Sequence, residues 1–272
     1  MAGGDSDAGT IPASIVRREK TNNNKVMQAA VQRAKIQPGD VNDVLIGNVL
    51  AELGFAKTGR TALNAAGFPN STTFHTVNRQ CSSSLQALTH IAHSIVVGQI
   101  DVGMAGGVES MTRNYGTRGI PVDVSPTLKE SPVKDARDCL LPMGITSENV
   151  AERYGVSRQA QDEFALESQN RASRAQKAGI FDREIVKIQA RWIDPETKEE
   201  SVKTVELDEG VRHGVTLEKL AALKPAFKEN GGSTAGNSFV LSSLATCYLQ
   251  TDDDSGHKSP TVRPPSSSPD GR

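Results

Sequence analysis

The spacing of apolar side chains divides the first part of the chain into alternating helices and strands. In residues 24–35 and 81–97 apolar positions recur every three or four residues, the period of one helix face, and residues 61–67 form an alanine-rich helical segment. Runs of β-branched and apolar residues predict strands at residues 44–49, 73–78 and 102–105. This alternation favours an α/β fold with a mostly parallel sheet.

The pattern changes after residue 115. Residues 116–137 are rich in proline, serine, aspartate and lysine, which predicts a loop that leaves the sheet. Helices are expected at residues 147–154 and 157–177, because each segment follows a capping-type residue and is closed by a glycine. Residues 185–193 and 202–205 are then expected to form a β-hairpin.

Both ends of the chain lack a strong apolar pattern. Residues 1–24 contain only a weak strand-like stretch at residues 11–16, and the first 15 residues have no basic region followed by an apolar one, so no secretory signal is expected. Residues 251–272 are rich in proline, serine and aspartate. Such a segment buries too little apolar surface to offset its ordering entropy, so a disordered tail is expected.

Composition argues against nucleic-acid and membrane partners. The 31 basic and 32 acidic residues leave a net charge of -1, too small to attract DNA or an anionic bilayer over a distance. No apolar run approaches the roughly 18 residues that span a membrane. The cysteines, Cys81, Cys139 and Cys247, have neither paired nor metal-ligand spacing, so no disulfide framework and no metal site are expected.

Cys81 lies where the predicted strand at residues 73–78 meets the predicted helix at residues 81–97. A thiol in the first turn of a helix faces the positive end of the helix dipole and unpaired backbone N–H groups, which favour the thiolate. Cys81 is therefore a candidate nucleophile. A small buried cysteine at a helix start is the alternative, and the local sequence leaves both open.

The sequence offers Cys81 no evident histidine partner. Because a helix rises about 1.5 Å per residue, His90 and His93 lie about 13 and 18 Å along the same helix from Cys81, too far for a hydrogen bond. His75 on a strand and His213 on a loop are expected to be structural or to border a ligand site. A cysteine hydrolase, a third possible function, would need one of these two to face Cys81.

Several sequence blocks occur in an order and spacing typical of one family. They are NRQCSSSLQA at residues 78–87, GGVESM at 106–111, PMGITSENVA at 142–151, LKPAF at 223–227 and TAGN at 234–237. In this combination the chain resembles the N-terminal half of the thiolases, and NRQCSS and LLPMGITSENVA are most similar to the peroxisomal branch. The resemblance implies thiolytic cleavage of 3-oxoacyl-CoA to acetyl-CoA and a shortened acyl-CoA in fatty-acid β-oxidation.

The resemblance also implies roles for single residues. Cys81 would accept the acyl group, and Met143 would line the acyl pocket. The positions expected along the bound CoA are Arg212, Ser233, Thr234, Ala235, Gly236 and Asn237. A cationic Arg212 suits a phosphate group, although a solvated loop arginine is the alternative. Acyl-CoA and CoA would be the partners, without a metal or redox cofactor, in a homodimer located in the peroxisome.

By the same resemblance the chain divides into segments, and it departs from the family in several places. The segments are an irregular N-terminus at residues 1–24 in place of the family's first strand, an α/β core at 25–115, a CoA-covering loop domain at 116–232, the end of the family match at 233–250 and the tail at 251–272. By this resemblance, the strand that the N-terminus replaces is central in the family's sheet. Ser84 stands where the family has a glycine. The match is expected to stop after Ser238, and the family's Asn-Glu-Ala-Phe block, its activating histidine in Gly-His-Pro and its second cysteine do not occur in this sequence. The resemblance therefore implies that no histidine lies within hydrogen-bond reach of the Cys81 sulfur.

These departures leave two functions open. The first is a thiolase-family acyltransferase that is catalytically incomplete as a chain of 272 residues. The second is a non-catalytic thiolase-like fragment that binds CoA or dimerises.

Overall fold

The computed structural model describes residues 22–111, 114, 119, 121–194, 196–208, 210–238 and 244–251, with the backbone alone for residues 22, 23 and 244–251. The expectations for residues 1–21 and 252–272, including the strand-like stretch at 11–16 and nearly all of the tail, lie outside these ranges.

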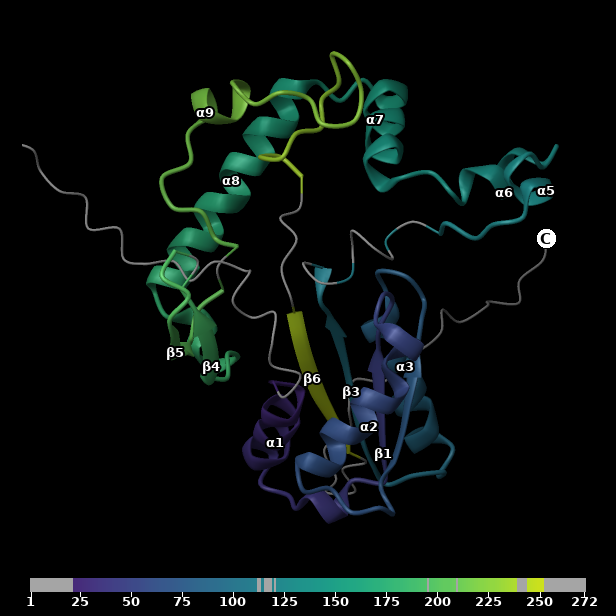
Figure 1. The fold of residues 1–272 in the computed structure, drawn as a ribbon, viewed down its shortest axis with the longest axis vertical. Helices are drawn as coiled ribbons and strands as arrows, with labels where there is room; N and C mark the ends of the chain where they lie inside the picture. Colours follow the sequence, from purple (N-terminus) through teal and green to yellow (C-terminus); the bar gives the residue numbers. More distant parts are fainter. Residues whose placement is uncertain are drawn as a thin grey trace, which may run out of the picture.

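A four-stranded sheet forms the centre of the N-terminal part (Figure 1). Its strands are β1 (Asp43–Gly47), β2 (Thr73–Val77), β3 (Val102–Glu109) and β6 (Leu244–Thr251). The order is β2-β1-β3-β6, in which β1 is parallel to β2 and β3, and β6 is antiparallel to β3. The predicted α/β fold with a mostly parallel sheet is confirmed.

Strand β6 was not predicted from the sequence. Residues 244–251 pair with the whole length of β3. The four described strands of this sheet are hydrogen-bonded in an unbroken series, so a further strand can join only beyond β2 or beyond β6.

Helices cover both faces of the sheet. Alternate side chains of a strand point to opposite faces, so Val44 and Ile46 of β1 pack beneath α1 (Asn22–Ala34) and α2 (Ala56–Ala65), while Leu45 packs beneath α3 (Ser83–Val96). Every residue of β1 is buried, as expected for a parallel strand covered on both faces. The side chains of α3 that complete its core are Ala87, Ile91 and Ile95.

The chain then builds a second, mainly helical part (Figure 1). It contains α5 (Pro126–Lys129), α6 (Lys134–Asp138), α7 (Met143–Tyr154), α8 (Arg158–Lys177), α9 (Leu217–Ala221) and the antiparallel hairpin of β4 (Ile188–Ile193) and β5 (Glu200–Val205). Its helices α7 and α9 lie above the carboxyl ends of the parallel strands, and its β-hairpin lies lower, to the left of β6 (Figure 1). The predicted hairpin and long helices are present. The helix α5 lies within residues 116–137, which were expected to be a loop, and α9 was not predicted.

Short 3-10 helices mark three turns: η2 (Pro38–Asp40), η3 (Glu52–Phe55) and η4 (Ile180–Arg183). Directly after η4, an arginine of the N-terminal part contacts the helical part. Arg33, at the end of α1, donates hydrogen bonds of 3.0 Å to the carbonyl oxygens of Glu184 and Ile185. Within the residues described, no helix is long and apolar enough to cross a membrane.

Candidate active site

The candidate nucleophile lies in a tight turn between β2 and α3. Cys81 is exposed, and α3 begins only at Ser83, with Ser82 as the residue that precedes the helix. The sequence placed Cys81 in the first helical turn, so the helix starts two residues later than predicted. Gln80 is left-handed with a φ of 51°, and Ser82 is not helical either, with φ −95° and ψ 15°, so the regular helix begins at Ser83.

Hydrogen bonds from its own side chains shape this turn. The Asn78 carboxamide oxygen accepts from the backbone N–H of Gln80 at 3.0 Å. The buried hydroxyl of Ser83 accepts from the N–H of Arg79 at 2.8 Å and donates to the carbonyl oxygen of Gln80 at 2.5 Å. The hydroxyl of Ser82 donates to the carbonyl oxygen of Arg79 at 2.9 Å. The turn is therefore held at both of its central peptide groups.

Two glycines let the start of α3 approach the sheet. A Cβ atom at Gly47 of β1 would lie 2.4 Å from the backbone carbon of Ser83, which is a steric clash. A Cβ atom at Gly107 of β3 would lie 2.6 Å from the Cβ of Ser84. Ser84, which replaces the family's usual glycine, therefore occupies space that Gly107 leaves open.

The loop after β1 is tied to the neighbouring strands at this same edge. Glu109, at the end of β3, accepts backbone hydrogen bonds from Val49 at 2.9 Å and Leu50 at 3.1 Å. Asn48 donates to the carbonyl oxygen of Val108 at 2.6 Å. Asn48 and Glu109 thus fix the loop beside the nucleophile turn, and no local sequence signal pointed to either of them.

The histidines have other surroundings. His75 lies 3.4 Å from a carboxylate oxygen of Asp43, and Nδ1 of His213 lies 2.6 Å from the hydroxyl of Ser173. His90 and His93 are on α3. In the described ranges, no hydrogen bond joins a histidine to the Cys81 sulfur.

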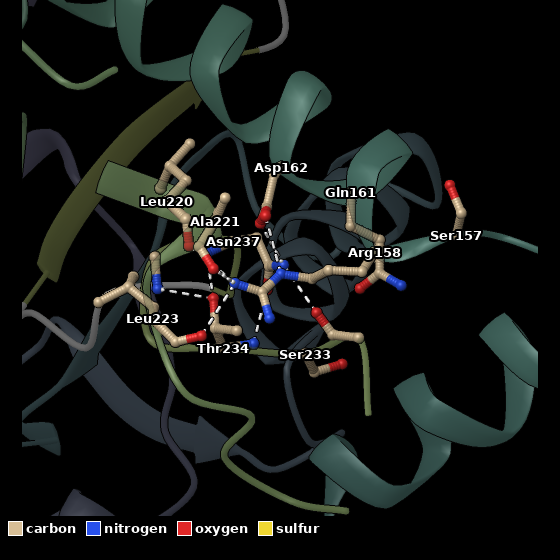
Figure 2. Close-up of polar contacts among 12 residues, drawn as sticks. Ser157, Arg158, Gln161, Asp162, Leu220, Ala221, Leu223, Ser233, Thr234 and Asn237 are labelled. Carbon is tan, nitrogen blue, oxygen red and sulfur yellow. Dashed lines mark hydrogen bonds and ion pairs between the residues drawn. The ribbon is translucent and has the colours of Figure 1, made fainter. Parts of the chain in front are cut away.

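A buried polar network organises residues 231–238 in the helical part (Figure 2). The Asn237 amide donates to Asp162 and to the carbonyl oxygen of Gly232, both at 2.8 Å, and its oxygen accepts from the N–H of Thr234 at 2.7 Å. Asp162 is only 1% exposed and also accepts from Nε of Arg158 at 2.8 Å. The network therefore connects this segment to α8.

Arg158 extends the network to α9. Its guanidinium donates to the carbonyl oxygens of Leu220 at 2.7 Å and Leu223 at 3.0 Å, at the end of α9 and just beyond it (Figure 2). These carbonyls lie where the regular bonding of α9 ends, and that of Leu220 also accepts from the backbone N–H of Leu223 at 3.1 Å. One side chain thus satisfies acceptors of α9 and the carboxylate of Asp162.

Glu148 of α7 holds the other side of the same segment. Its carboxylate accepts from the backbone N–H of Ser233 at 2.8 Å and from that of Gly232 at 3.0 Å. Burial alone raises the pKa of Glu148, but the hydrogen bonds from Ser233 and Gly232, with Lys228 nearby, outweigh it and hold the pKa below its ordinary value of 4.5. Glu148 is therefore a carboxylate near neutral pH.

Sequence comparison identifies the family. The family model described as "Thiolase, N-terminal domain" matches residues 19–251. The chain belongs to the thiolase family. It is 48% identical over 224 residues to peroxisomal 3-ketoacyl-CoA thiolase B of Rattus norvegicus and 47% identical to the peroxisomal 3-ketoacyl-CoA thiolase of Homo sapiens. These matches cover 82% of this chain and 52% of each relative, so the chain spans about half the length of the curated thiolases it matches.

Solved thiolase structures share this fold. The dimeric peroxisomal thiolase of Saccharomyces cerevisiae superimposes with a TM-score of 0.72 at 37% identity, covering 85% of this chain and 59% of that one. The acetyl-CoA acetyltransferase of Bacillus anthracis gives a TM-score of 0.69 at 35% identity, covering 87% and 60%. The peroxisomal branch of the thiolases that the motifs indicated is thus among the chain's similar proteins.

The residues expected to line the acyl pocket or the bound CoA of a thiolase lie in the helical part. Met143, the first residue of α7, is 73% exposed, and Arg212 is exposed with its backbone N–H bonded to the Gln169 side chain at 3.1 Å. Ser233 and Thr234 are buried. Ala235 is exposed, whereas Gly236 and Asn237 are half-buried.

Their contact with CoA stays a prediction. The side chains of Ser233, Thr234 and Asn237 make hydrogen bonds within the protein. In this structure Asn237 therefore stabilises the segment through its contacts with the rest of the chain. The supporting residues, Asp162 and Glu148, were missed by sequence analysis. What distinguishes these two carboxylates from other acidic residues on their helices is that they are buried, and burial is seen only in the three-dimensional structure. In the described ranges, no group of acidic, histidine and cysteine side chains is arranged to hold a metal ion.

Proposed function

We propose that this chain is the nucleophile-bearing half of a thiolase, in which Cys81 accepts an acyl group from 3-oxoacyl-CoA and passes it to CoA. The observation that carries the proposal is the placement of Cys81. It is an exposed thiol on a turn held by internal hydrogen bonds, between a strand of a parallel sheet and the start of α3. Ligands of α/β proteins commonly bind at this carboxyl edge of the strands.

The chemistry requires two acyl transfers at the same sulfur. The Cys81 thiolate attacks the 3-oxo carbon, the bond between the second and third acyl carbons breaks, and the departing acetyl-CoA carbanion takes up a proton. The thiolate of a second CoA then attacks the new thioester and releases the shortened acyl-CoA, which restores Cys81. The first step needs a proton donor, and the thiols need a base.

The described residues supply the nucleophile without a histidine base. Acylation of Cys81 and thiolytic cleavage of a carbon–carbon bond depend on such a base to different degrees. Direct transfer of an acyl group from acyl-CoA to Cys81 exchanges one thioester for another and needs no carbon–carbon cleavage. We therefore expect acyl-CoA to acylate Cys81, while thiolytic turnover by the 272-residue chain stays at the level of a Cys81→Ala control.

The test separates these activities. Purified chain is incubated with acetoacetyl-CoA and CoA, and acetyl-CoA is measured by chromatography beside Cys81→Ala. Turnover that disappears in Cys81→Ala would show that a base reaches Cys81 and would contradict the incomplete mechanism. Binding of CoA without acylation of Cys81 would favour the second function, a non-catalytic CoA-binding fragment.

The assembly and location of the protein are part of the same proposal. The similar proteins from rat and man are named as peroxisomal, and the similar yeast structure is a dimer. These findings support a peroxisomal protein that acts as a homodimer with acyl-CoA and CoA as its ligands. Sedimentation of the purified chain tests the dimer, and a single monomeric species would contradict it.

A further inference from the structure

The geometry points to Ser83 as the positioning residue that fixes the Cys81 thiol for acyl transfer. Its use in acyl transfer rests on the proposed function, whereas its effect on the turn does not. Three consecutive serines, Ser82, Ser83 and Ser84, follow Cys81, and only Ser83 is buried.

The turn needs an external restraint because Gln80 is strained. Its φ of 51° belongs to the left-handed region, where the Cβ of any residue other than glycine crowds its own backbone. Such a conformation persists only where surrounding contacts impose it. The orientation of Cys81 depends on this angle, since the carbonyl group of Gln80 is part of the peptide unit that joins it to Cys81.

The Ser83 hydroxyl supplies that restraint. It accepts from the N–H of Arg79 at 2.8 Å and donates to the carbonyl oxygen of Gln80 at 2.5 Å. These two groups lie on either side of the Gln80 φ angle, so one hydroxyl closes a ring around the strained bond. The backbone N–H of Ser83 adds a further bond of 3.1 Å to the same carbonyl oxygen of Gln80.

Ser83 is itself fixed by the sheet, and its neighbours are not equivalent. It is 4% exposed, and its backbone lies so close to β1 that a Cβ at Gly47 would be 2.4 Å from it. Ser82 and Ser84 are exposed. The Ser82 hydroxyl donates only to the carbonyl oxygen of Arg79, and Ser84 packs against Gly107. Identical side chains at adjacent positions therefore offer matched controls.

The experiment measures the rate at which iodoacetamide alkylates Cys81, a reaction in which the sulfur displaces iodide. Exposed Cys139 in the same chain serves as the internal reference, and the two rates are read from peptide masses. Ser83→Ala removes a hydroxyl that makes two hydrogen bonds, so we expect the Cys81 to Cys139 rate ratio to fall by about fivefold or more. The fall arises because a relaxed turn no longer holds the Cys81 sulfur in one exposed orientation before α3, so fewer encounters with iodoacetamide are productive.

Ser82→Ala and Ser84→Ala should change the ratio by less than about twofold, because neither hydroxyl bonds to groups on both sides of the Gln80 φ angle; the Ser82 hydroxyl bonds to Arg79 alone. Adding Gln80→Gly to Ser83→Ala should restore most of the lost rate, since glycine adopts a φ near 51° without strain. A merely structural role of Ser83 would not be rescued in this way. An unchanged ratio in Ser83→Ala, an equal fall in the control variants, or a failure of Gln80→Gly to restore the rate would each overturn the proposal.

Two further comparisons keep the result interpretable. If Ser83→Ala alone does not fold, the double variant is compared with Gln80→Gly, and the proposal then requires nearly equal ratios. Alkylation needs no acyl-CoA, so the expected alkylation pattern without any acylation would contradict the proposed function and leave the role of Ser83 intact.

Discussion

Replacing Asp162 by alanine tests the buried network that organises residues 231–238. The carboxylate is 1% exposed and accepts hydrogen bonds of 2.8 Å from Arg158 and from Asn237. Removing it leaves a guanidinium without its anion and an amide with one partner fewer. We expect Asp162→Ala to destabilise the fold and to loosen the segment that includes Asn237.

The magnitude follows from these contacts. Breaking a buried ion pair on one side costs about 3–5 kcal/mol, and a single hydrogen bond to a charged group contributes about 1.5–3 kcal/mol. The Arg158 side chain is 26% exposed and keeps carbonyl acceptors near α9, which places the loss near the lower limit. We expect about 3 kcal/mol, or a fall in Tm of about 6–12 °C for a chain of this size.

The same helix provides a matched control. Arg171 and Glu167 of α8 also form an ion pair four residues apart, at 2.6 Å, but both side chains are largely exposed. Glu167→Ala should therefore have little effect on Tm. Thermal unfolding followed by circular dichroism measures both variants. A fall for Asp162→Ala no larger than that for Glu167→Ala would refute the reasoning.

Two other predictions follow from single contacts. The pKa of Glu148 is lowered in the folded chain, so the ionised carboxylate stabilises the fold above its ordinary pKa of 4.5, and this stabilisation is lost as the pH falls through the lower pKa of the folded state. Urea unfolding should therefore show Glu148→Gln less stable than the native chain at pH 7, with a difference in unfolding free energy that narrows below about pH 4.5. A difference that does not change with pH would contradict this. Gly47→Ala should destabilise the chain by about 1–3 kcal/mol or more, because the new Cβ would lie 2.4 Å from the backbone of Ser83. Gly39→Ala, where nothing lies within 4 Å, is its control in the same unfolding assay, and equal effects of the two would count against the predicted clash.

Local patterns of apolar residues were enough to predict most of the helices and strands. The stripe of α3 and the apolar runs of β1 and β3 are short-range patterns, and each predicts an element of the observed kind. Strand β6 could not be found in this way, because its place depends on pairing with β3, more than a hundred residues earlier in the chain. Antiparallel pairing across that separation leaves no signal in residues 244–251 alone.

The sequence was sufficient to predict the nucleophile of the site but not the residues that hold the site in place. Cys81 stood out because it lies between a strand and a helix, but the turn that places it before α3 contains a left-handed Gln80, and a left-handed conformation has no signature in a non-glycine residue. Asp162 has the spacing of an ordinary partner for Arg158 on a helix surface. Its burial and its bond to Asn237 depend on a segment 75 residues away, so sequence alone gives no reason to select it.

The central claim is that Cys81 is the acyl-accepting residue, and peptide mapping after incubation with acetyl-CoA tests it most directly. The native chain and Cys81→Ala are digested after the reaction, and the acetyl group is located by mass. The account predicts an acetyl thioester on Cys81 and none on exposed Cys139, with the signal absent from Cys81→Ala. Equal acetylation of Cys81 and Cys139, or no acetylation of Cys81 in chain that is folded and binds CoA, would contradict it.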